Sequence, residues 1–230
     1  MDKVVCYAMT RKLYYQIPPV LNALNAKSRP DRIYLMTEDD DIGLKMPDNV
    51  IVRNVAEQTV FRKDGPNFYQ KWSWMVLMKA ALSKVFPDEH RVLMLDVDTL
   101  VCGDISELWR MDMNGCYLAG VQEPYWTRTL GRLYVNMGSV LFDLDALKAD
   151  GTDDRIIAAL NEKRYFLPEQ DCINEICAGK ILELPPEYNA NNYTKMVENP
   201  KIRHFANEGH WWERKEVTMW ADSEPEETNP

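Results

Sequence analysis

Two aspartates at the end of one apolar segment are the residues best placed to do chemistry in this chain. Asp96 and Asp98 follow the apolar run 91–95, and apolar residues resume at Leu100. A short aliphatic run of this kind predicts a strand buried on both faces of a sheet. Ligands of open α/β sheets bind at the carboxyl ends of strands, so both carboxylates are expected at a ligand site. Because neighbouring acids repel, a divalent cation is expected between them, and carboxylate oxygens suit Mg²⁺ or Mn²⁺.

The same residues allow two other interpretations. An Asp-rich turn that closes a strand needs no ligand. Asp96-Val-Asp98-Thr99 also matches the opening motif of haloacid-dehalogenase-like phosphatases, in which the first Asp would be the nucleophile and the second the general acid. That motif normally follows the first strand of its fold, whereas a long α/β stretch precedes it here. The later pair Asp153-Asp154 opens a predicted helix instead of ending a strand, which also disfavours the phosphatase.

The composition is that of an acidic globular protein. The chain has 230 residues, of which 46% are hydrophobic and 10% aromatic, and this length suits one large domain with a substantial core. A net charge of −9 argues against binding to nucleic acid or to an anionic membrane. No apolar segment approaches the length of a transmembrane helix, and the N-terminus lacks a signal pattern. The five cysteines form no C-x-x-C pair, which argues against structural zinc or a disulfide framework and favours a cytoplasmic protein.

Alternating apolar strands and amphipathic helices predict one α/β domain with a central, mostly parallel sheet. Besides the strand before Asp96, strands are expected over residues 4–9, 31–37, 50–55, 116–121, 134–143, 180–184 and 201–205. Helices are expected over residues 14–26, 69–85, 106–110, 153–163 and 172–178. Gly138 marks a bulge or a close backbone approach in its strand. Cys6 and Cys102 are expected in core strands. The domain is predicted to span residues 1–212, followed by a segment 213–230 whose acidic tail, 221–230, is expected to be disordered.

Four segments, taken together and in this order, resemble the family 8 retaining glycosyltransferases, which include glycogenin and bacterial lipopolysaccharide galactosyltransferases. They are residues 91–101, 135–142, 168–174 and 202–205, and the resemblance extends over residues 3–212. It implies a GT-A fold, a single Rossmann-like domain that transfers a hexose from a nucleotide sugar. The donor is expected to be UDP-glucose or UDP-galactose and the cofactor Mn²⁺, with Mg²⁺ as the alternative. The acceptor, whether a glycan, a lipid-linked molecule or a protein, stays open.

The resemblance implies a metal site made of three side chains. Asp96 and Asp98 match the D-x-D ligands of the family, and the backbone around Val97 would lie near the ribose. His204 matches the third protein ligand. Mn²⁺ accepts imidazole together with carboxylates, so the three residue types are chemically compatible. Without the resemblance, His204 would be interpreted more simply as a core histidine.

The resemblance also assigns residues to the nucleotide. Ala8, Thr10 and Tyr14 match the region that holds the base and the ribose. The family often has Asp or Asn there, where this chain has Thr10-Arg-Lys, so the identity of the base stays open. Lys79 matches a basic residue that contacts the phosphates of the donor, and Lys71 is its rival for this role.

Asn136 and Gly138 match the segment that approaches the transferred sugar. Gln170 matches a residue on the β-face of that sugar and Asp171 one that contacts its hydroxyls, while Glu169 is the first acid of this segment. Gln170 is a poor nucleophile, so front-face attack is favoured over double displacement through a carboxylate.

Near the C-terminus the family commonly shows H-F-x-G-x-x-K-P-W. Gly209 matches the glycine region, and His210 stands where the phosphate-contacting Lys would be. A neutral imidazole stabilises a leaving diphosphate less than an ammonium does, so either His210 is protonated or Arg214 or Lys215 replaces it. This substitution favours the alternative function, a catalytically silent module that binds nucleotide sugars or glycans.

Overall fold

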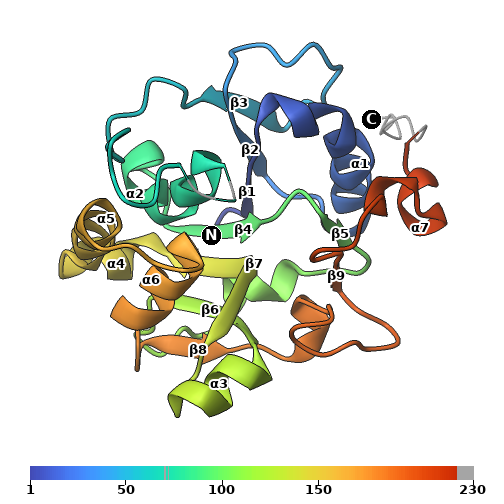
Figure 1. Cartoon of the computed structure of the whole chain (residues 1–230). Coiled ribbons are helices and arrows are strands. Elements are labelled where there is room, and N and C mark those ends of the chain that lie inside the picture. Colours follow the sequence, from blue (N-terminus) through green and yellow to red (C-terminus); the bar gives the residue numbers. More distant parts are fainter. Residues whose placement is uncertain (70, 72, 222–230) are drawn as a thin grey trace.

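The computed structural model describes residues 1–69, 71 and 73–221, which fold around a central seven-stranded sheet (Figure 1). The strands are β1 (Val4–Ala8), β2 (Arg32–Thr37), β3 (Val50–Asn54), β4 (Arg91–Leu95), β5 (Thr99–Val101), β6 (Leu118–Gln122), β7 (Val135–Asp143), β8 (Ile181–Glu183) and β9 (Ile202–His204). The α-helices are α1 (Ile17–Ser28), α2 (Leu82–Val85), α3 (Pro124–Leu130), α4 (Leu144–Ala149), α5 (Thr152–Glu162), α6 (Pro168–Ile176) and α7 (Lys215–Thr218). The 3₁₀ helices are η1 (Arg11–Gln16), η2 (Trp74–Ala81), η3 (Ser106–Arg110), η4 (Pro186–Tyr188) and η5 (Trp211–Glu213).

The sheet has the order β3-β2-β1-β4-β7-β6-β8. Strands β3, β2, β1 and β4 run parallel, β7 is antiparallel to both β4 and β6, and β8 is parallel to β6. Strands β5 and β9 form a separate antiparallel pair. The predicted mostly parallel α/β sheet is therefore confirmed, and the carboxyl end of β4 lies between its parallel and its antiparallel half.

Both faces of the sheet are covered, because alternate side chains of its strands enter two different apolar clusters. Val5 and Tyr7 of β1 pack in one cluster with α1, whereas Val4 and Cys6 pack in the other with η2, α5 and α6. In Figure 1, α1 and α7 lie together on one side, and α4, α5 and α6 lie on the other. Residues 92–95 of β4 are fully buried, as a strand in the middle of three layers must be.

Most expected elements are present within a few residues of their predicted ends, and the differences have physical causes. The helix expected over 69–85 is a 3₁₀ helix from Trp74 that continues into α2; residues 70 and 72 lie outside the described part. Helix α3 was not among the expected helices. None of its residues is buried, so its sequence carries no apolar periodicity. Its signals are instead Pro124 at the first turn and Gly131 in the left-handed conformation (φ 64°) after the last.

Two expectations about single positions have different outcomes. The irregularity expected near Gly138 is present: between Gly120 and Gln122 of β6 the register shifts, where β7 runs from Val140 to Val135. The core position expected for Cys102 is wrong, since this side chain is exposed just after β5.

The segment after residue 212 contributes to the same core. Val217 of α7 is fully buried in the cluster that contains α1. Asn22 of α1 donates a hydrogen bond from Nδ2 to the backbone oxygen of Trp220 (2.8 Å). The domain boundary at residue 212 stays a prediction. Of the tail expected to be disordered, residues 222–230 lie outside the part of the chain that the structure describes. No helix among the described residues is both long and apolar enough to span a bilayer.

Candidate active site

The turn between β4 and β5 presents the two aspartates, and strand pairing brings the histidine to them. The amide of Asp96 donates to the backbone oxygen of Gly138 (2.9 Å), which extends the β4–β7 pairing to the first acid. Thr99 closes the turn, because its hydroxyl and its amide both donate to the backbone oxygen of Asp96 (2.7 and 3.1 Å). Strand β9 pairs with β5 so that His204 lies opposite Thr99. A residue remote in sequence is thereby fixed beside the turn.

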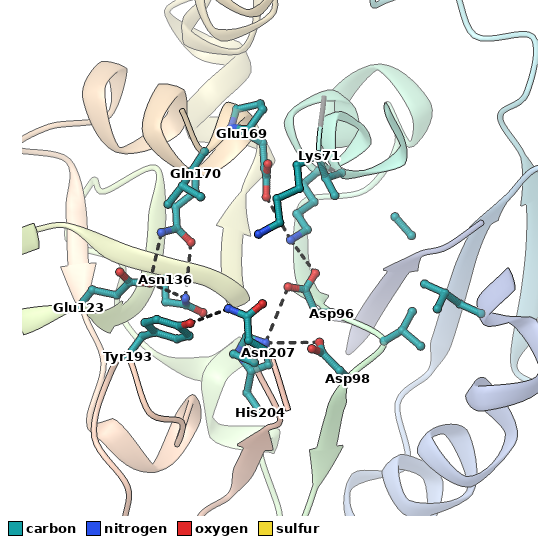
Figure 2. Close-up of a pocket in the computed structure, with 18 of the residues that line it drawn as sticks. Lys71, Asp96, Asp98, Glu123, Asn136, Glu169, Gln170, Tyr193, His204 and Asn207 are labelled. Carbon is teal, nitrogen blue, oxygen red and sulfur yellow. Dashed lines mark hydrogen bonds and ion pairs between the residues drawn. The ribbon is translucent and has the colours of Figure 1, made fainter. Parts of the chain in front are cut away.

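The three side chains form a set that fits a divalent cation. His204 Nε2 lies 3.3 Å from Asp98 Oδ1 and 3.9 Å from Asp96 Oδ2, and one ligand atom from each residue falls within 4.8 Å of the others (Figure 2). Burial opposes the charged form of Asp98, but the neighbouring imidazole and Lys79 outweigh it and lower the pKa of this carboxyl. Burial likewise opposes the charged form of His204, and Asp98 outweighs it and raises the pKa of the ring. Two carboxylates and one imidazole suit Mn²⁺, with Mg²⁺ satisfied less well by nitrogen.

Gly138 is required by the position of the histidine ring. A Cβ atom built on Gly138 would overlap the His204 imidazole, coming within 2.9 Å of Nε2 and closer still to Cε1 and Nδ1. The close backbone approach predicted for this glycine is therefore an approach to His204. This contact gives the Asn-x-Gly segment of β7 a role in the geometry of the three-residue cluster.

We expect Gly138→Ala to displace the His204 ring from Asp98 and to weaken metal binding, because the added methyl group occupies the volume of the ring. The loss of Mn²⁺ affinity should be about 10–100-fold, as for other changes that misorient a ligand. Titration calorimetry of the metal-free protein with Mn²⁺ measures it. Gly120→Ala is the matched control in the neighbouring strand, since its added Cβ would meet Val135 at 3.1 Å and no site residue. Unchanged Mn²⁺ affinity in Gly138→Ala would contradict the steric account.

Lys79 is a buried cation in contact with Asp96. Its ammonium is 2.6 Å from Asp96 Oδ1 and 3.4 Å from Glu169 Oε1, and it donates to the backbone oxygen of Met137 (3.3 Å). Burial favours the neutral amine, but the two carboxylates outweigh this effect and raise the pKa of Lys79. The charge of Lys79 is thus shared between two acids of the site. Lys71 lines the same cavity, and Figure 2 shows its side chain extending toward the region of Glu169 and Asp96.

A cavity of about 560 Å³ opens beside the three ligand residues. Of the predicted site residues, it is lined by Ala8, Lys79, Asp96, Val97, Asp98, Asn136, Gln170 and His204, and also by the rival cation Lys71. The structure therefore brings together the residues predicted for the metal, for the phosphates and for the transferred sugar.

The remaining predicted residues lie elsewhere. Thr10 and Tyr14 do not line the cavity; the hydroxyl of Tyr14 accepts from the amide of Glu38 (2.9 Å) and donates to Asp39 (3.2 Å). Leu13 and Gln16, on the same 3₁₀ helix, line it instead.

Asp171 does not line the cavity; its carboxylate accepts from the hydroxyl of Tyr134 (2.6 Å) and from the amide of Leu167 (2.8 Å). Its neighbour Glu169 is the acid of that segment that lines the cavity. Burial raises the pKa of Glu169, opposed by the nearby Lys79.

Gly209 and His210 also lie outside the lining. The His210 side chain is 75% exposed and its Nδ1 is 3.2 Å from a Glu213 carboxylate oxygen. Arg214 and Lys215, the two alternatives to His210 as the phosphate-contacting residue, lie at the beginning of α7. Arg214 pairs there with Glu208 (2.5 Å). Ala206, Asn207 and Trp211 are the cavity residues of this segment.

Glu123 is a cavity residue that the sequence analysis missed. It is 5% exposed, and its Oε1 accepts from Asn136 Nδ2 (2.6 Å) and Gln170 Nε2 (3.2 Å). Burial raises the pKa of this carboxyl, and the two amides oppose the shift. The amide of Met137 donates to Gln170 Oε1 (3.0 Å), so the orientation of Gln170 is fixed. The sequence feature that could have indicated Glu123 is its position just after the carboxyl end of a predicted strand.

Comparison with known proteins places this fold and site in a family. The model of the family "Glycosyl transferase family 8" matches residues 41–216. The chain belongs to this family, which confirms the resemblance read from the four segments. Membership also removes the phosphatase interpretation of the Asp96–Thr99 motif.

Individual relatives give the same picture. The lipopolysaccharide 1,2-glucosyltransferase of Escherichia coli is 29% identical over 150 residues, covering 54% of this chain and 44% of the relative. General stress protein A of Bacillus subtilis is 27% identical over 143 residues, covering 50% of each. The chain thus spans about half the length of these relatives. The galactosyltransferase LgtC, solved in complex with donor and acceptor sugar analogs, superimposes with a TM-score of 0.67 at 16% identity, covering 97% of this chain and 98% of LgtC. This likeness confirms the predicted GT-A fold.

Proposed function

We propose that this chain is a divalent-metal-dependent, retaining glycosyltransferase that moves a hexose from a UDP-linked sugar to an acceptor hydroxyl. The observation that carries the proposal is the Asp96–Asp98–His204 cluster, assembled at the wall of a cavity by β5–β9 pairing. Family membership supports the transfer of a sugar. The names of relatives, a glucosyltransferase and a galactosyltransferase, support a hexose.

Each part of the cavity has a role in this proposal. A bound Mn²⁺ or Mg²⁺ would supply charge that balances the diphosphate of the donor and of the leaving nucleotide. Asp96, Asp98 and His204 would hold that ion, and Lys71 or Lys79 would meet the phosphates. The amides of Asn136 and Gln170 would line the side where the sugar lies.

The proposal also includes front-face attack. The Gln170 amide forms hydrogen bonds with Glu123, Tyr134 and the Met137 amide (3.2, 3.2 and 3.0 Å), which fix its orientation at the edge of the cavity. As an amide it is a poor nucleophile. The acceptor hydroxyl would attack from the side of the leaving group, and the departing phosphate would accept its proton. The outcome is retention of configuration at the anomeric carbon.

The direct test is a screen of nucleotide sugars for hydrolysis in the presence and absence of Mn²⁺. We expect release of UDP from UDP-glucose or UDP-galactose, abolished by EDTA and restored by Mn²⁺, because water can replace the missing acceptor. Chromatography of the released nucleotide reports base and metal dependence together, and NMR of the first transferred product reports the anomeric configuration. A protein that cleaves no nucleotide sugar with any divalent metal would contradict the proposal.

The second candidate is a catalytically silent module that binds a nucleotide sugar or a glycan. It is favoured by His210, which occupies the motif position of a phosphate-contacting Lys yet is exposed and turned toward Glu213. Calorimetric titration with UDP and Mn²⁺, combined with the hydrolysis screen, separates the two: binding without any turnover favours the module.

A further inference from the structure

The buried Asn189 contacts the edge of the His204 ring that is opposite the two aspartates. His204 presents Nε2 to the two aspartates, and its other ring nitrogen, Nδ1, lies 2.9 Å from Asn189 Oδ1. We propose that Asn189 is a positioning residue that holds neutral His204 as the Nδ1–H tautomer, so that the Nε2 lone pair faces Asp96 and Asp98. This inference rests on the metal site proposed above.

Asn191 fixes the orientation of Asn189 on one side. The amides of Tyr193 and Thr194 both donate to Asn191 Oδ1 (2.7 and 3.1 Å), and a backbone amide can only donate. The Asn191 side chain therefore points its NH₂ group the other way, toward Asn189 Oδ1 (2.8 Å). That contact requires Asn189 to present its carbonyl oxygen on this side.

Asn136 fixes the orientation of Asn189 on the opposite side. The amide of Gly138 donates to Asn136 Oδ1 (3.0 Å), which fixes this atom as oxygen. Asn189 Nδ2 lies 2.9 Å from the same oxygen, so the NH₂ group of Asn189 must face Asn136. Three backbone amides, two acting through Asn191 and one through Asn136, thus determine the orientation of Asn189 from both sides.

The tautomer of His204 follows from this orientation. Asn189 Oδ1 is an acceptor, so the ring nitrogen that faces it at 2.9 Å must carry the hydrogen. Asn191 Nδ2 is also 3.3 Å from Nδ1, but its two hydrogens have shorter contacts to Asn189 Oδ1 (2.8 Å) and to the backbone oxygen of Asn189 (3.2 Å). A neutral ring with hydrogen on Nδ1 has its lone pair on Nε2, the nitrogen that would bind a metal.

Burial makes the arrangement hard to reverse. Asn189 is 0% exposed, Asn191 1% and His204 4%, so bulk water is poorly placed to replace a lost partner. Turning the Asn189 amide over would set two NH₂ groups against each other and two oxygens against each other, in a buried region where unsatisfied groups are costly. The same amide links the metal side of the cavity to Asn136, on the side assigned to the sugar.

Asn189→Leu tests the proposal, because leucine has nearly the same shape and neither hydrogen bond. The first measurement is the ¹⁵N spectrum of His204 in metal-free protein, at a pH where the ring is neutral, which distinguishes the two tautomers. With three histidines in the chain the signals are readily assigned by replacing His90 and His210. We expect the Nδ1–H tautomer in the parent and a mixture of tautomers in Asn189→Leu.

The second measurement is Mn²⁺ affinity by calorimetry. Asn189→Leu should lose about 10–100-fold, the usual effect of removing the partner that orients a metal-binding histidine. Asn189→Asp keeps an oxygen acceptor for Nδ1–H and should stay within about threefold of the parent. Asn67→Ala is the matched control: Asn67 is 2% exposed and bonded to backbone groups of Leu160, Lys163 and Tyr165, so its loss reduces stability without touching His204.

The outcomes separate this inference from the proposed function. An Nε2–H tautomer in the metal-free parent overturns the inference even if no variant folds. Equal Mn²⁺ affinity in Asn189→Leu and the parent overturns it too. If the parent binds no divalent metal, the proposed metal site fails, while the tautomer measurement still decides whether Asn189 orients the ring.

Discussion

Asp98→Ala is expected to abolish metal-dependent release of UDP from the donor while the chain remains folded. Asp98 Oδ1 lies 3.3 Å from His204 Nε2, so its removal leaves two of the three ligands. Its backbone oxygen still accepts from the amide of Phe205 (2.8 Å), which keeps the β5–β9 connection in place. We expect Mn²⁺ affinity to fall by more than about 100-fold, beyond the effect of losing an orienting partner.

Thermal melting with and without Mn²⁺ gives a readout independent of activity. Ligand binding to the folded state raises the melting temperature of the parent, and this rise should disappear in Asp98→Ala. Without metal the melting temperature should change little, because the mutation removes both repulsion from Asp96 and attraction to His204. Asp64→Ala serves as control, since this exposed aspartate pairs with Arg62 and does not line the cavity. Near-parental Mn²⁺-dependent turnover in Asp98→Ala would eliminate the metal-site assignment.

The acidic motif and its strand were predictable because they depend on local sequence. A buried strand shows as an aliphatic run, and residues at its carboxyl end face the ligand side of an α/β sheet. His204 was different: nothing local distinguishes it from a core histidine, and only the order of four motifs indicated its role. The β5–β9 pairing that brings it to Asp98 joins segments too distant for any periodicity to connect.

The polar contacts in the rest of the site were not predictable, because they join buried side chains of distant segments, even where the residues themselves, such as Asn136 and Gln170, had been assigned to the site. Glu123, Asn136 and Gln170 come from three elements and meet through hydrogen bonds that no spacing encodes. Asn189 lies in a loop after η4, and its importance depends on which atoms its amide faces. The sequence motif indicated Gly138, but the reason for a glycine at this position, the nearby His204 ring, is apparent only in the folded structure.

Lys79→Met is expected to destabilise the fold strongly, because it removes the cation between two acids. Lys79 is 5% exposed in its side chain, and its ammonium contacts Asp96 (2.6 Å) and Glu169 (3.4 Å). Breaking a buried ion pair by removing one partner costs about 3–5 kcal/mol, since the remaining charge is left uncompensated. Urea unfolding of the metal-free protein, followed by circular dichroism, measures the change.

The double variant Lys79→Met/Glu169→Gln shows whether charge or packing causes the loss. Glu169 is 9% exposed and the Asp96 side chain 31%, so neutralising Glu169 removes the more buried of the two uncompensated charges and should recover at least half of the lost stability. No recovery would mean that the packing of the lysine stem matters more than its charge.

Lys71→Met, compared with the double variant, decides which lysine meets the donor phosphates. The ammonium of Lys79 already contacts Asp96 and Glu169, so a phosphate would have to compete with these two carboxylates for it. If Lys79 acts mainly on Asp96, Lys71→Met should raise the donor KM more than the double variant does. A larger increase in the Lys79 double variant would instead assign the phosphate contact to Lys79, and the buried ion pairs would then have to rearrange when the donor binds.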